Sequence, residues 1–336
     1  MLASNNHLGG DGISRILCAL AVLTSLLCAC TPKAANHQTH VTSSHAAATT
    51  SQPAHTSSAQ TTSASPPPAP TPQNPAIDPT LSRTITSQLS RITGRNSAFV
   101  QWQGHSQAWT FNNRPQKSAS SIKLFILATL FRQAQAGQLD LNEPYVLLAS
   151  DRVSGTGDLQ GMAPGTSFTL LELAQKMITI SDNTATNILI RKVGGFAAVN
   201  ALAKQMGATA TQLTRFMGDA TAIAQGRDNL SSAKDIGTLL WRLINHQLIS
   251  PQADTDMLAM LNQTQNHTKL PALLPAGITV YNKTGEYDDY GVENDAAIFQ
   301  ANHRAVVIVV MSEAGQLAQQ VAAMNQIGQA VARFLQ

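Results

Sequence analysis

The string Ser120-Ser121-Ile122-Lys123 stands at the start of the longest apolar helical pattern in the part of the chain that follows residue 80. Residues 118–136 have a helical pattern, and apolar side chains occur nearly all round that helix: Ile122, Leu124, Phe125, Ile126, Leu127, Leu130 and Phe131. A helix that is apolar on every side belongs in the middle of a core. Because residues three apart share a helix face, the Lys123 amine can lie beside the Ser120 hydroxyl near the helix N-terminus.

A serine beside a partly buried lysine is a candidate nucleophile with its own base. Burial disfavours the ammonium form and lowers the pKa of a lysine, so Lys123 could take the proton of the Ser120 hydroxyl. Backbone N–H groups at the helix N-terminus can stabilise developing negative charge. On its own, the pattern is also explained by a helix cap followed by a lysine whose charged end reaches solvent.

Two further strings, Ser181-Asp182-Asn183 and Lys283-Thr284-Gly285, follow about 60 and then about 100 residues later. The first comes after an apolar helical run, where Asp182 and Asn183 could simply cap the next helix. The second ends a predicted strand over 279–282 and could be an ordinary turn. Each string is weak alone, but each falls at a predicted helix start, helix junction or strand end.

The periodicity of the rest of the chain predicts strands and helices in separate blocks. Strands are predicted over 98–102, 108–111, 278–282, 296–300 and 305–311, and these five could pair as one antiparallel sheet. Helices are predicted over 81–92, 168–180, 184–193, 196–206, 233–244, 251–261 and 317–334. Periodicity alone therefore predicts an α plus β protein, long enough to bury a sizeable core.

The motifs S-x-x-K, S-D-N and K-T-G, in this order, occur together in class A β-lactamases and penicillin-binding proteins. Residues 80–336 resemble this family of serine hydrolases, and the flanking segments 180–187 and 290–295 also resemble class A sequences. The resemblance implies an α/β fold of the β-lactamase/transpeptidase type. Its five-stranded antiparallel sheet would be flanked by helices and joined by an inserted all-helical lobe.

The resemblance also implies roles for the first two motifs. Ser120 would attack a lactam carbonyl, Lys123 would take its proton, and Ser181 would pass a proton to the leaving nitrogen. Asn183 would hold the substrate amide and contact Lys123, while Asp182 would brace the loop.

The third motif would line the far wall of the cleft. Lys283 and Thr284 would bind the substrate carboxylate, and Gly285 would keep the strand edge open to a ligand backbone. The backbone N–H groups of Glu286 and Ser120 would form an oxyanion hole, each group contributing roughly 3 kcal/mol to lowering the barrier.

One departure from the class A pattern concerns the second half of the reaction. Class A enzymes carry a glutamate in an E-x-x-L-N motif, which activates the water that clears the acyl-enzyme, but residues 207–235 contain no glutamate. Asp219 and Asp228 are the only carboxylates there before Asp235. Asp219 is a possible surrogate base. Loss of a positioned base costs roughly 10²- to 10⁴-fold in the step that it serves.

The N-terminus has the pattern of a bacterial export signal. Arg15 precedes an apolar run over 16–28, which is short for a membrane span. The run ends in Leu27-Cys28-Ala29-Cys30, which resembles a lipobox, so Cys30 would carry the lipid after cleavage. An ordinary secretory signal is the alternative. The three cysteines, Cys18, Cys28 and Cys30, all lie here, so no disulfide is expected within the mature domain.

Three regions are predicted: a lipoprotein signal peptide (1–29), a disordered Ser/Thr/Pro-rich tether (30–80) and a catalytic domain (81–336). The tether has almost no large apolar residues with which to offset its ordering entropy. Its histidines could bind a metal: His37, His40, His45 and His55. No carboxylate or cysteine joins them, so neither a metal nor a cofactor is expected.

Three functions remain open at this point. The first is a β-lactamase that works through an acyl-enzyme on Ser120; the second is a peptidase of D-Ala-D-Ala stem peptides in peptidoglycan; the third is a non-catalytic binding module. The expected partners are a β-lactam or stem peptide and, through the lipid, a bacterial membrane outside the cytoplasm. The net charge of +3 and the lack of basic clusters exclude nucleic acid, and a monomer is expected.

Overall fold

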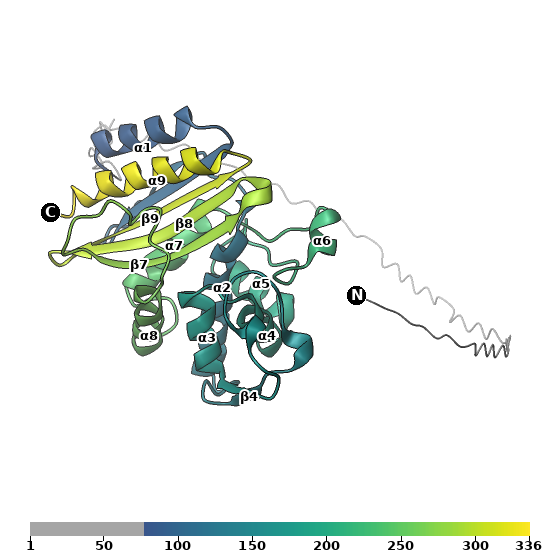
Figure 1. Cartoon of the computed structure of the whole chain (residues 1–336). Helices are drawn as coiled ribbons and strands as arrows, with labels where there is room; N and C mark the ends of the chain where they lie inside the picture. The colour runs from purple at the N-terminus through teal and green to yellow at the C-terminus, as the bar shows by residue number, and fades with distance from the viewer. Residues whose placement is uncertain (1–76) are drawn as a thin grey trace, which may run out of the picture. The chain divides into compact units, whose positions relative to one another are not determined.

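The computed structural model describes residues 77–336, so the predicted export signal, Cys30 and almost all of the tether lie outside the described residues. Five antiparallel strands form the main sheet in the order β2-β1-β9-β8-β7 (Figure 1). They are β1 (Arg95–Trp102), β2 (Trp109–Phe111), β7 (Thr279–Tyr287), β8 (Val292–Ala301) and β9 (Arg304–Glu313). The predicted five-stranded antiparallel sheet is confirmed, and four of its strands are longer than predicted.

The central strand β9 is buried on both faces, which explains its nearly continuous apolar run. In β9, Val307 and Val309 pack into one apolar cluster, while Val306, Ile308 and Val310 pack into the other. Successive residues of a strand point to opposite faces, so each face receives every second side chain.

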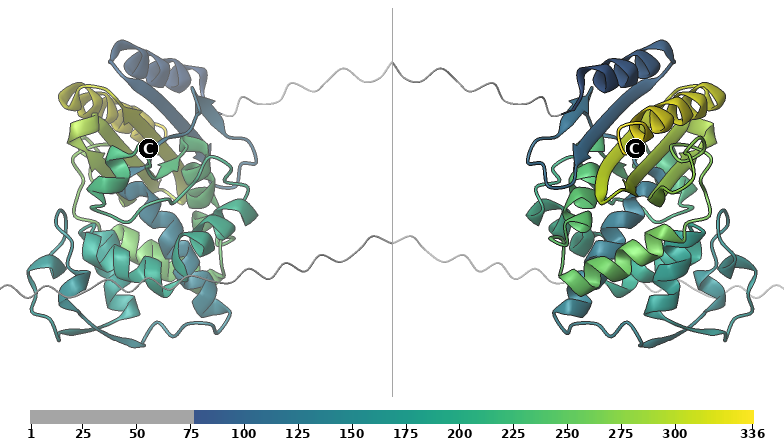
Figure 2. Two further views of the ribbon diagram at one scale, coloured as in Figure 1. Left: turned by 90° about the vertical axis from the view of Figure 1, so that its right-hand side faces the viewer. Right: turned by 90° about the vertical axis from the view of Figure 1, so that its left-hand side faces the viewer.

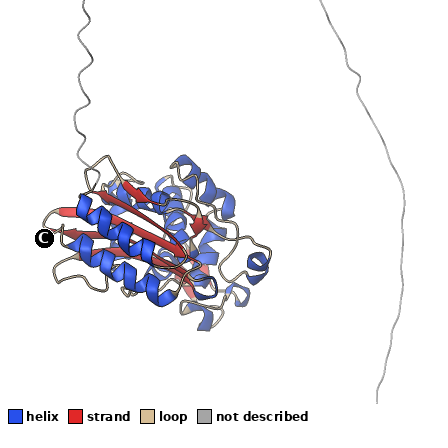
Figure 3. Ribbon diagram, turned by 90° about the horizontal axis from the view of Figure 1, so that it is seen from above, coloured by secondary structure: helices blue, strands red, loops and turns tan. Residues whose placement is uncertain are grey.

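Helices cover both faces of the sheet. α1 (Pro79–Arg91) and α9 (Leu317–Ala332) pack against each other on one face, as Figure 3 shows from above. α7 (Ala233–Ile244) covers the other face and contacts β1, β8 and β9. It approaches closely because Gly237 has no side chain: a Cβ there would lie 2.2 Å from the Phe99 ring.

A helical lobe lies beneath this second face (Figures 1 and 2). It contains α3 (Leu170–Thr179), α4 (Asn183–Lys192), α5 (Gly195–Gln205) and α8 (Pro251–Asn262), all of which contact α2 (Lys123–Gln135). Every residue of α2 from Lys123 to Phe131 is buried. The prediction of a central buried helix is therefore confirmed.

Several short elements were not predicted from the sequence. A 3-10 turn, Ala119–Ile122, precedes α2, so Ser120 lies in this turn and not in the α-helix proper. Two small ladders pair β3 (Gln116–Lys117) with β6 (Leu230–Ser231) and β4 (Pro144–Val146) with β5 (Ser167–Thr169), and α6 spans Ala220–Ala224. None of the described helices is long and apolar enough to cross a membrane.

Candidate active site

The turn that carries Ser120 is held tightly against the sheet. The Ser118 N–H and hydroxyl both donate to the Asn229 carbonyl, at 2.9 and 3.0 Å, and Asn294 Nδ2 donates to the Ser118 carbonyl at 3.1 Å. On the β7 side, a Cβ on Gly285 would lie 2.9 Å from Ser120 N, so only glycine permits this approach. The Ser120 backbone N–H is thereby fixed beside β7, the strand that carries Lys283.

The Lys123 side chain is fully buried and connects the first two motifs. Its Nζ donates to the Ser181 carbonyl at 2.6 Å, to Ser181 Oγ at 3.0 Å and to Asn183 Oδ1 at 3.0 Å. Burial, and then the charge of Lys283, lower the pKa of Lys123 well below its ordinary value, although Asp182 and Glu286 oppose the shift. A buried amine that loses its proton readily has the chemistry of a general base.

Ser181 lies between two lysines. Its Oγ accepts hydrogen bonds from Lys123 Nζ at 3.0 Å and from Lys283 Nζ at 3.1 Å, while its carbonyl accepts from Thr156 Oγ1 at 2.6 Å. Its backbone has φ +57°, a conformation that L-residues seldom adopt outside functional sites and turns. Because both acceptor positions of the hydroxyl are filled by lysines, its own proton is free to be donated elsewhere.

Asp182 has the bracing role implied by the resemblance. Its Oδ1 accepts the Ala185 N–H at 2.8 Å and so caps α4, and its Oδ2 accepts the Leu159 N–H at 2.9 Å. Gly157 packs against it so closely that a Cβ there would lie 2.2 Å from Oδ2. By capping α4, Asp182 also holds its two neighbours, Ser181 and Asn183, in place.

Lys283 projects from β7 into the site. Its Nζ donates to the Thr284 carbonyl at 2.9 Å in addition to Ser181 Oγ. Burial lowers its pKa to about 8, against the raising effect of Glu286. Near neutral pH it is therefore a cation with a proton that is easily lost.

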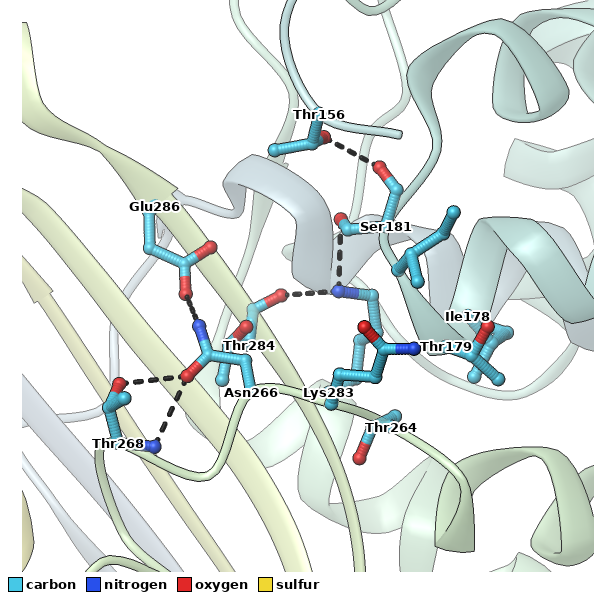
Figure 4. Close-up of a pocket in the computed structure, with 12 residues that line it drawn as sticks. Thr156, Ile178, Thr179, Ser181, Thr264, Asn266, Thr268, Lys283, Thr284 and Glu286 are labelled. Carbon is cyan, nitrogen blue, oxygen red and sulfur yellow. Dashed lines mark hydrogen bonds between the residues drawn. The ribbon is translucent and has the colours of Figure 1, made fainter. Parts of the chain in front are cut away.

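A cleft with two adjoining hollows brings the three motifs together. One hollow, of about 370 Å³, is lined by Ser181, Lys283 and Thr284, among others (Figure 4). The other, of about 310 Å³, is lined by Ser120 and Asn183. Glu286 and Thr156 line both hollows. Six of the site residues predicted within the described chain line the cleft: Ser120, Ser181, Asn183, Lys283, Thr284 and Glu286. Lys123 is buried and contacts two of them, Ser181 and Asn183, whereas Asp219 does not line the cleft.

Asp219 lies between Gly218 and Ala220, which line the Ser120 hollow, but does not line the hollow itself. Asp219 caps α6, where its Oδ1 accepts the Ala222 N–H at 2.9 Å, and it is not among the residues that line either hollow. A surrogate base at Asp219 therefore stays a prediction, and this carboxylate would have to give up its cap of α6 or act through its second oxygen.

Met217 lines the cleft together with Ser120, and this residue was not predicted from the sequence. It lines the same hollow as Ser120, and its backbone N–H and carbonyl are both bound by the Asn187 side chain, at 2.8 and 3.0 Å. Arg215 anchors the loop by donating to Asp228 Oδ1 from Nη2, at 2.7 Å, and from Nε, at 2.9 Å. The sequence shows only that an arginine and an aspartate flank a loop without glutamate. This pattern does not indicate which residue of the loop lines the cleft.

Asp228 is the anchor of this loop and not part of the cleft. Besides Arg215, Lys117 Nζ contacts its Oδ2 at 2.6 Å. Burial alone would raise the pKa of Asp228, but the hydrogen bond from Lys117 and the charge of Arg215 together hold it below its ordinary value. A paired, buried carboxylate of this kind fixes a loop and is a poor candidate for a base.

Comparison with known proteins agrees with this geometry. The model of the family described as "Beta-lactamase enzyme family" matches residues 81–335, so the chain belongs to the β-lactamase enzyme family. Beta-lactamase ROB-1 of Haemophilus influenzae is 25% identical over 246 residues, which cover 71% of this chain and 79% of that protein. A beta-lactamase of Streptomyces fradiae is 32% identical over 159 residues, covering 46% of this chain and 51% of that protein.

Solved structures with this fold include both β-lactamases and a protein named PBP-A. The β-lactamase from Sphaerobacter thermophilus superposes with a TM-score of 0.71 at 28% identity, covering 77% of this chain and 98% of that chain. A variant of PBP-A, solved as an acyl-enzyme complex with penicillin G, superposes with a TM-score of 0.69 at 26% identity, covering 78% of this chain and 98% of that chain. The fold implied by the sequence motifs is confirmed.

Proposed function

We propose that this protein is a serine hydrolase that opens the β-lactam ring through an acyl-enzyme on Ser120. Family membership supports a β-lactam hydrolase. The observation that carries the assignment of residues is the fully buried Lys123, whose Nζ lies 3.0 Å from both Ser181 Oγ and Asn183 Oδ1 behind the hollow lined by Ser120. This arrangement supports the proposal that Ser120 is the nucleophile, Lys123 the base and Ser181 the proton donor.

The acylation step follows from these positions. Lys123 first loses the proton of one of its three hydrogen bonds, which burial favours, and Ser120 Oγ then forms a bond to the lactam carbonyl carbon while its own proton passes to the neutral amine. The backbone N–H groups of Ser120 and Glu286 would bind the oxyanion. As the carbon–nitrogen bond breaks, the Ser181 hydroxyl gives its proton to the nitrogen and is reprotonated by Lys123. The lysine is then neutral again.

Deacylation is the slower half of the proposed reaction. Water must attack the ester on Ser120. Met217, which lines the Ser120 hollow, has no group that could take a proton from this water. Glu286 is the one carboxylate among the residues that line this hollow. The loss of a positioned base lowers the rate of the step that it serves by about 10²- to 10⁴-fold. The acyl-enzyme is therefore expected to persist longer than in an enzyme with a carboxylate at position 217.

Intact mass spectrometry of the protein mixed with penicillin G, followed over time, tests this function. We expect one adduct with the mass of the drug on Ser120, formed within the first time points and lost as hydrolysed drug accumulates. A permanent adduct with no hydrolysed drug would favour the D-Ala-D-Ala peptidase or the binding module instead. The absence of any adduct and of any hydrolysis would refute the proposal.

The pH dependence of acylation should report on Lys283. Because the pKa of Lys283 is about 8, this side chain is charged below that pH and loses its charge above it. We therefore expect the second-order acylation constant for a penicillin to fall above about pH 8, as the cation that binds the substrate carboxylate is lost. A penicillin methyl ester, which lacks that carboxylate, should not show the decline. A constant that stays flat to about pH 10 in both substrates would contradict this role.

We also propose that Cys30 carries a lipid that holds the enzyme at the outer side of a bacterial membrane. Support comes from the apolar run and the sequence Leu27-Cys28-Ala29-Cys30, and two acyl chains on one residue suffice for stable anchoring. Cys30→Ser should abolish the incorporation of labelled palmitate and release the protein from the membrane fraction. Cys18→Ser is the matched control and should retain the label. A parent protein without label would refute the anchor.

A further inference from the structure

The hollow on the Lys283 side of the cleft is polar and carries two opposite charges. Hydroxyl and amide side chains dominate its lining, including Thr156, Thr179, Thr264, Gln265, Asn266 and Thr268. Lys283 and Glu286 are the only charged residues among those that line it. Figure 4 shows the Glu286 carboxylate next to Asn266 and Thr284, at the wall formed by β7.

The Glu286 carboxylate is fixed by one side chain that lines the hollow, Asn266, and by one that does not, Lys269. Its Oε1 accepts hydrogen bonds from Lys269 Nζ at 2.7 Å and from Asn266 Nδ2 at 2.9 Å. Lys269 is only 2% exposed and does not line the hollow. It also contacts the buried carboxylate of Glu293 at 2.5 Å. The cleft therefore presents the anion, while its counter-cation is hidden and shared with a second carboxylate.

The charge state of Glu286 agrees with this placement. Burial alone would raise its pKa, but Lys269 and then Lys283 hold the pKa of Glu286 below its ordinary value. The side chain is therefore an anion at neutral pH. Because the carboxylate is held by hydrogen bonds before any substrate arrives, it would meet a ligand cation without losing side-chain freedom.

We propose that this hollow is a leaving-group subsite in which Lys283 and Glu286 together select substrates that carry a carboxylate and, close to it, a positive charge. The inference rests on the proposed function, because the Ser181 hydroxyl that would protonate the leaving nitrogen lies at this hollow. The substrate carboxylate would bind Lys283 and Thr284, as in the proposed reaction. A cation on the same fragment would then face Glu286, and an additional anion there would be repelled.

Two cephalosporins provide a matched test of this selectivity. Cephaloridine and cephalothin share a thienylacetamido side chain and a ring carboxylate, but the first carries a cationic pyridiniomethyl group where the second carries a neutral acetoxymethyl group. The ratio of their second-order acylation constants should fall about five- to tenfold in Glu286→Gln. Comparing ratios between parent and variant removes the intrinsic difference in reactivity of the two drugs, and the backbone N–H of residue 286 is retained.

Glu293→Gln is the control variant. Glu293 also contacts Lys269, but it is buried and does not line either hollow. Its substitution should leave the ratio within about twofold of the parent value, so a merely structural effect on Lys269 is distinguished from recognition at the wall. A ratio that is the same in the parent and in Glu286→Gln, or that falls equally in both variants, would overturn the subsite.

A measurement on the parent protein keeps the inference testable if Glu286→Gln does not fold. Raising NaCl from about 0.05 to about 0.5 M should lower the ratio, because salt screens the attraction between the pyridinium and the partly accessible carboxylate. A ratio that is independent of salt would count against the subsite. If the parent reacts with neither cephalosporin, the proposed function itself fails; if it reacts with both without a charge preference, only the subsite fails.

Discussion

Replacing Ser120 by alanine is expected to abolish covalent labelling by penicillin and to reduce lactam hydrolysis by about 10⁴- to 10⁶-fold. The Ser120 hydroxyl supplies the atom that becomes acylated, and it lies in a turn that hydrogen bonds of Ser118 with Asn229 and Asn294 hold in place. Labelling by a fluorescent penicillin, followed by gel electrophoresis, measures the first effect. Hydrolysis followed by lactam absorbance measures the second.

Ser121→Ala is a close control for this experiment. Ser121 is buried, and its Oγ has no hydrogen-bond partner within the described residues. Ser120, in contrast, lines the cleft. We expect the Ser121 variant to keep its labelling, and both variants to unfold within a few degrees of the parent, since neither loses a hydrogen bond that the structure shows. Labelling that survives in Ser120→Ala would mean that another residue is the nucleophile.

Met217→Glu is expected to accelerate clearance of the acyl-enzyme by about 10²- to 10⁴-fold. The residue lines the hollow that contains Ser120, and its backbone is fixed on both sides by the Asn187 side chain. A carboxylate at this position would adjoin the space from which water attacks the ester. Stopped reactions analysed by intact mass would show the adduct disappearing faster, while its rate of formation changes less.

Asp219→Asn provides the matching test of the alternative base. Because the Asp219 carboxylate caps α6, the variant should clear the adduct at the parent rate and lose at most about 1 kcal/mol of stability. An adduct trapped by Asp219→Asn would show that the loop moves during the reaction and brings this carboxylate to the ester. Unchanged clearance in Met217→Glu would show that a base at this wall is not what limits deacylation.

Most of the fold could be predicted from local patterns. β9 is a nearly continuous run of β-branched and apolar residues, β1 and β8 contain shorter apolar runs, and α2 is apolar all round, which leaves few places for these segments except a core. The short ladders β3–β6 and β4–β5 could not be predicted, since two or three residues carry no readable period. The 3-10 turn before α2 was also missed, because the helical pattern does not distinguish a tight first turn from an α-helical one.

The motif residues could be predicted because the three motifs combine characteristic residue types with a recognisable spacing. Their contacts could not, because Lys123, Ser181 and Lys283 come from three separate elements and meet only when the lobe packs on the sheet. The hydrogen bond between Lys283 and Ser181 joins residues 102 positions apart. No local pattern encodes such a distance.

Local sequence patterns were enough to predict the fold class, to propose Ser120 with Lys123 as nucleophile and base, and to reveal that residues 207–235 contain no glutamate. Three features became visible only in the folded molecule: Met217 lines the cleft, Asp219 caps α6, and Lys269, the counter-cation of Glu286, is buried. The physical reason is that residue identity sets what a side chain can do. Its direction and its charged neighbours are set by packing between segments far apart in the chain.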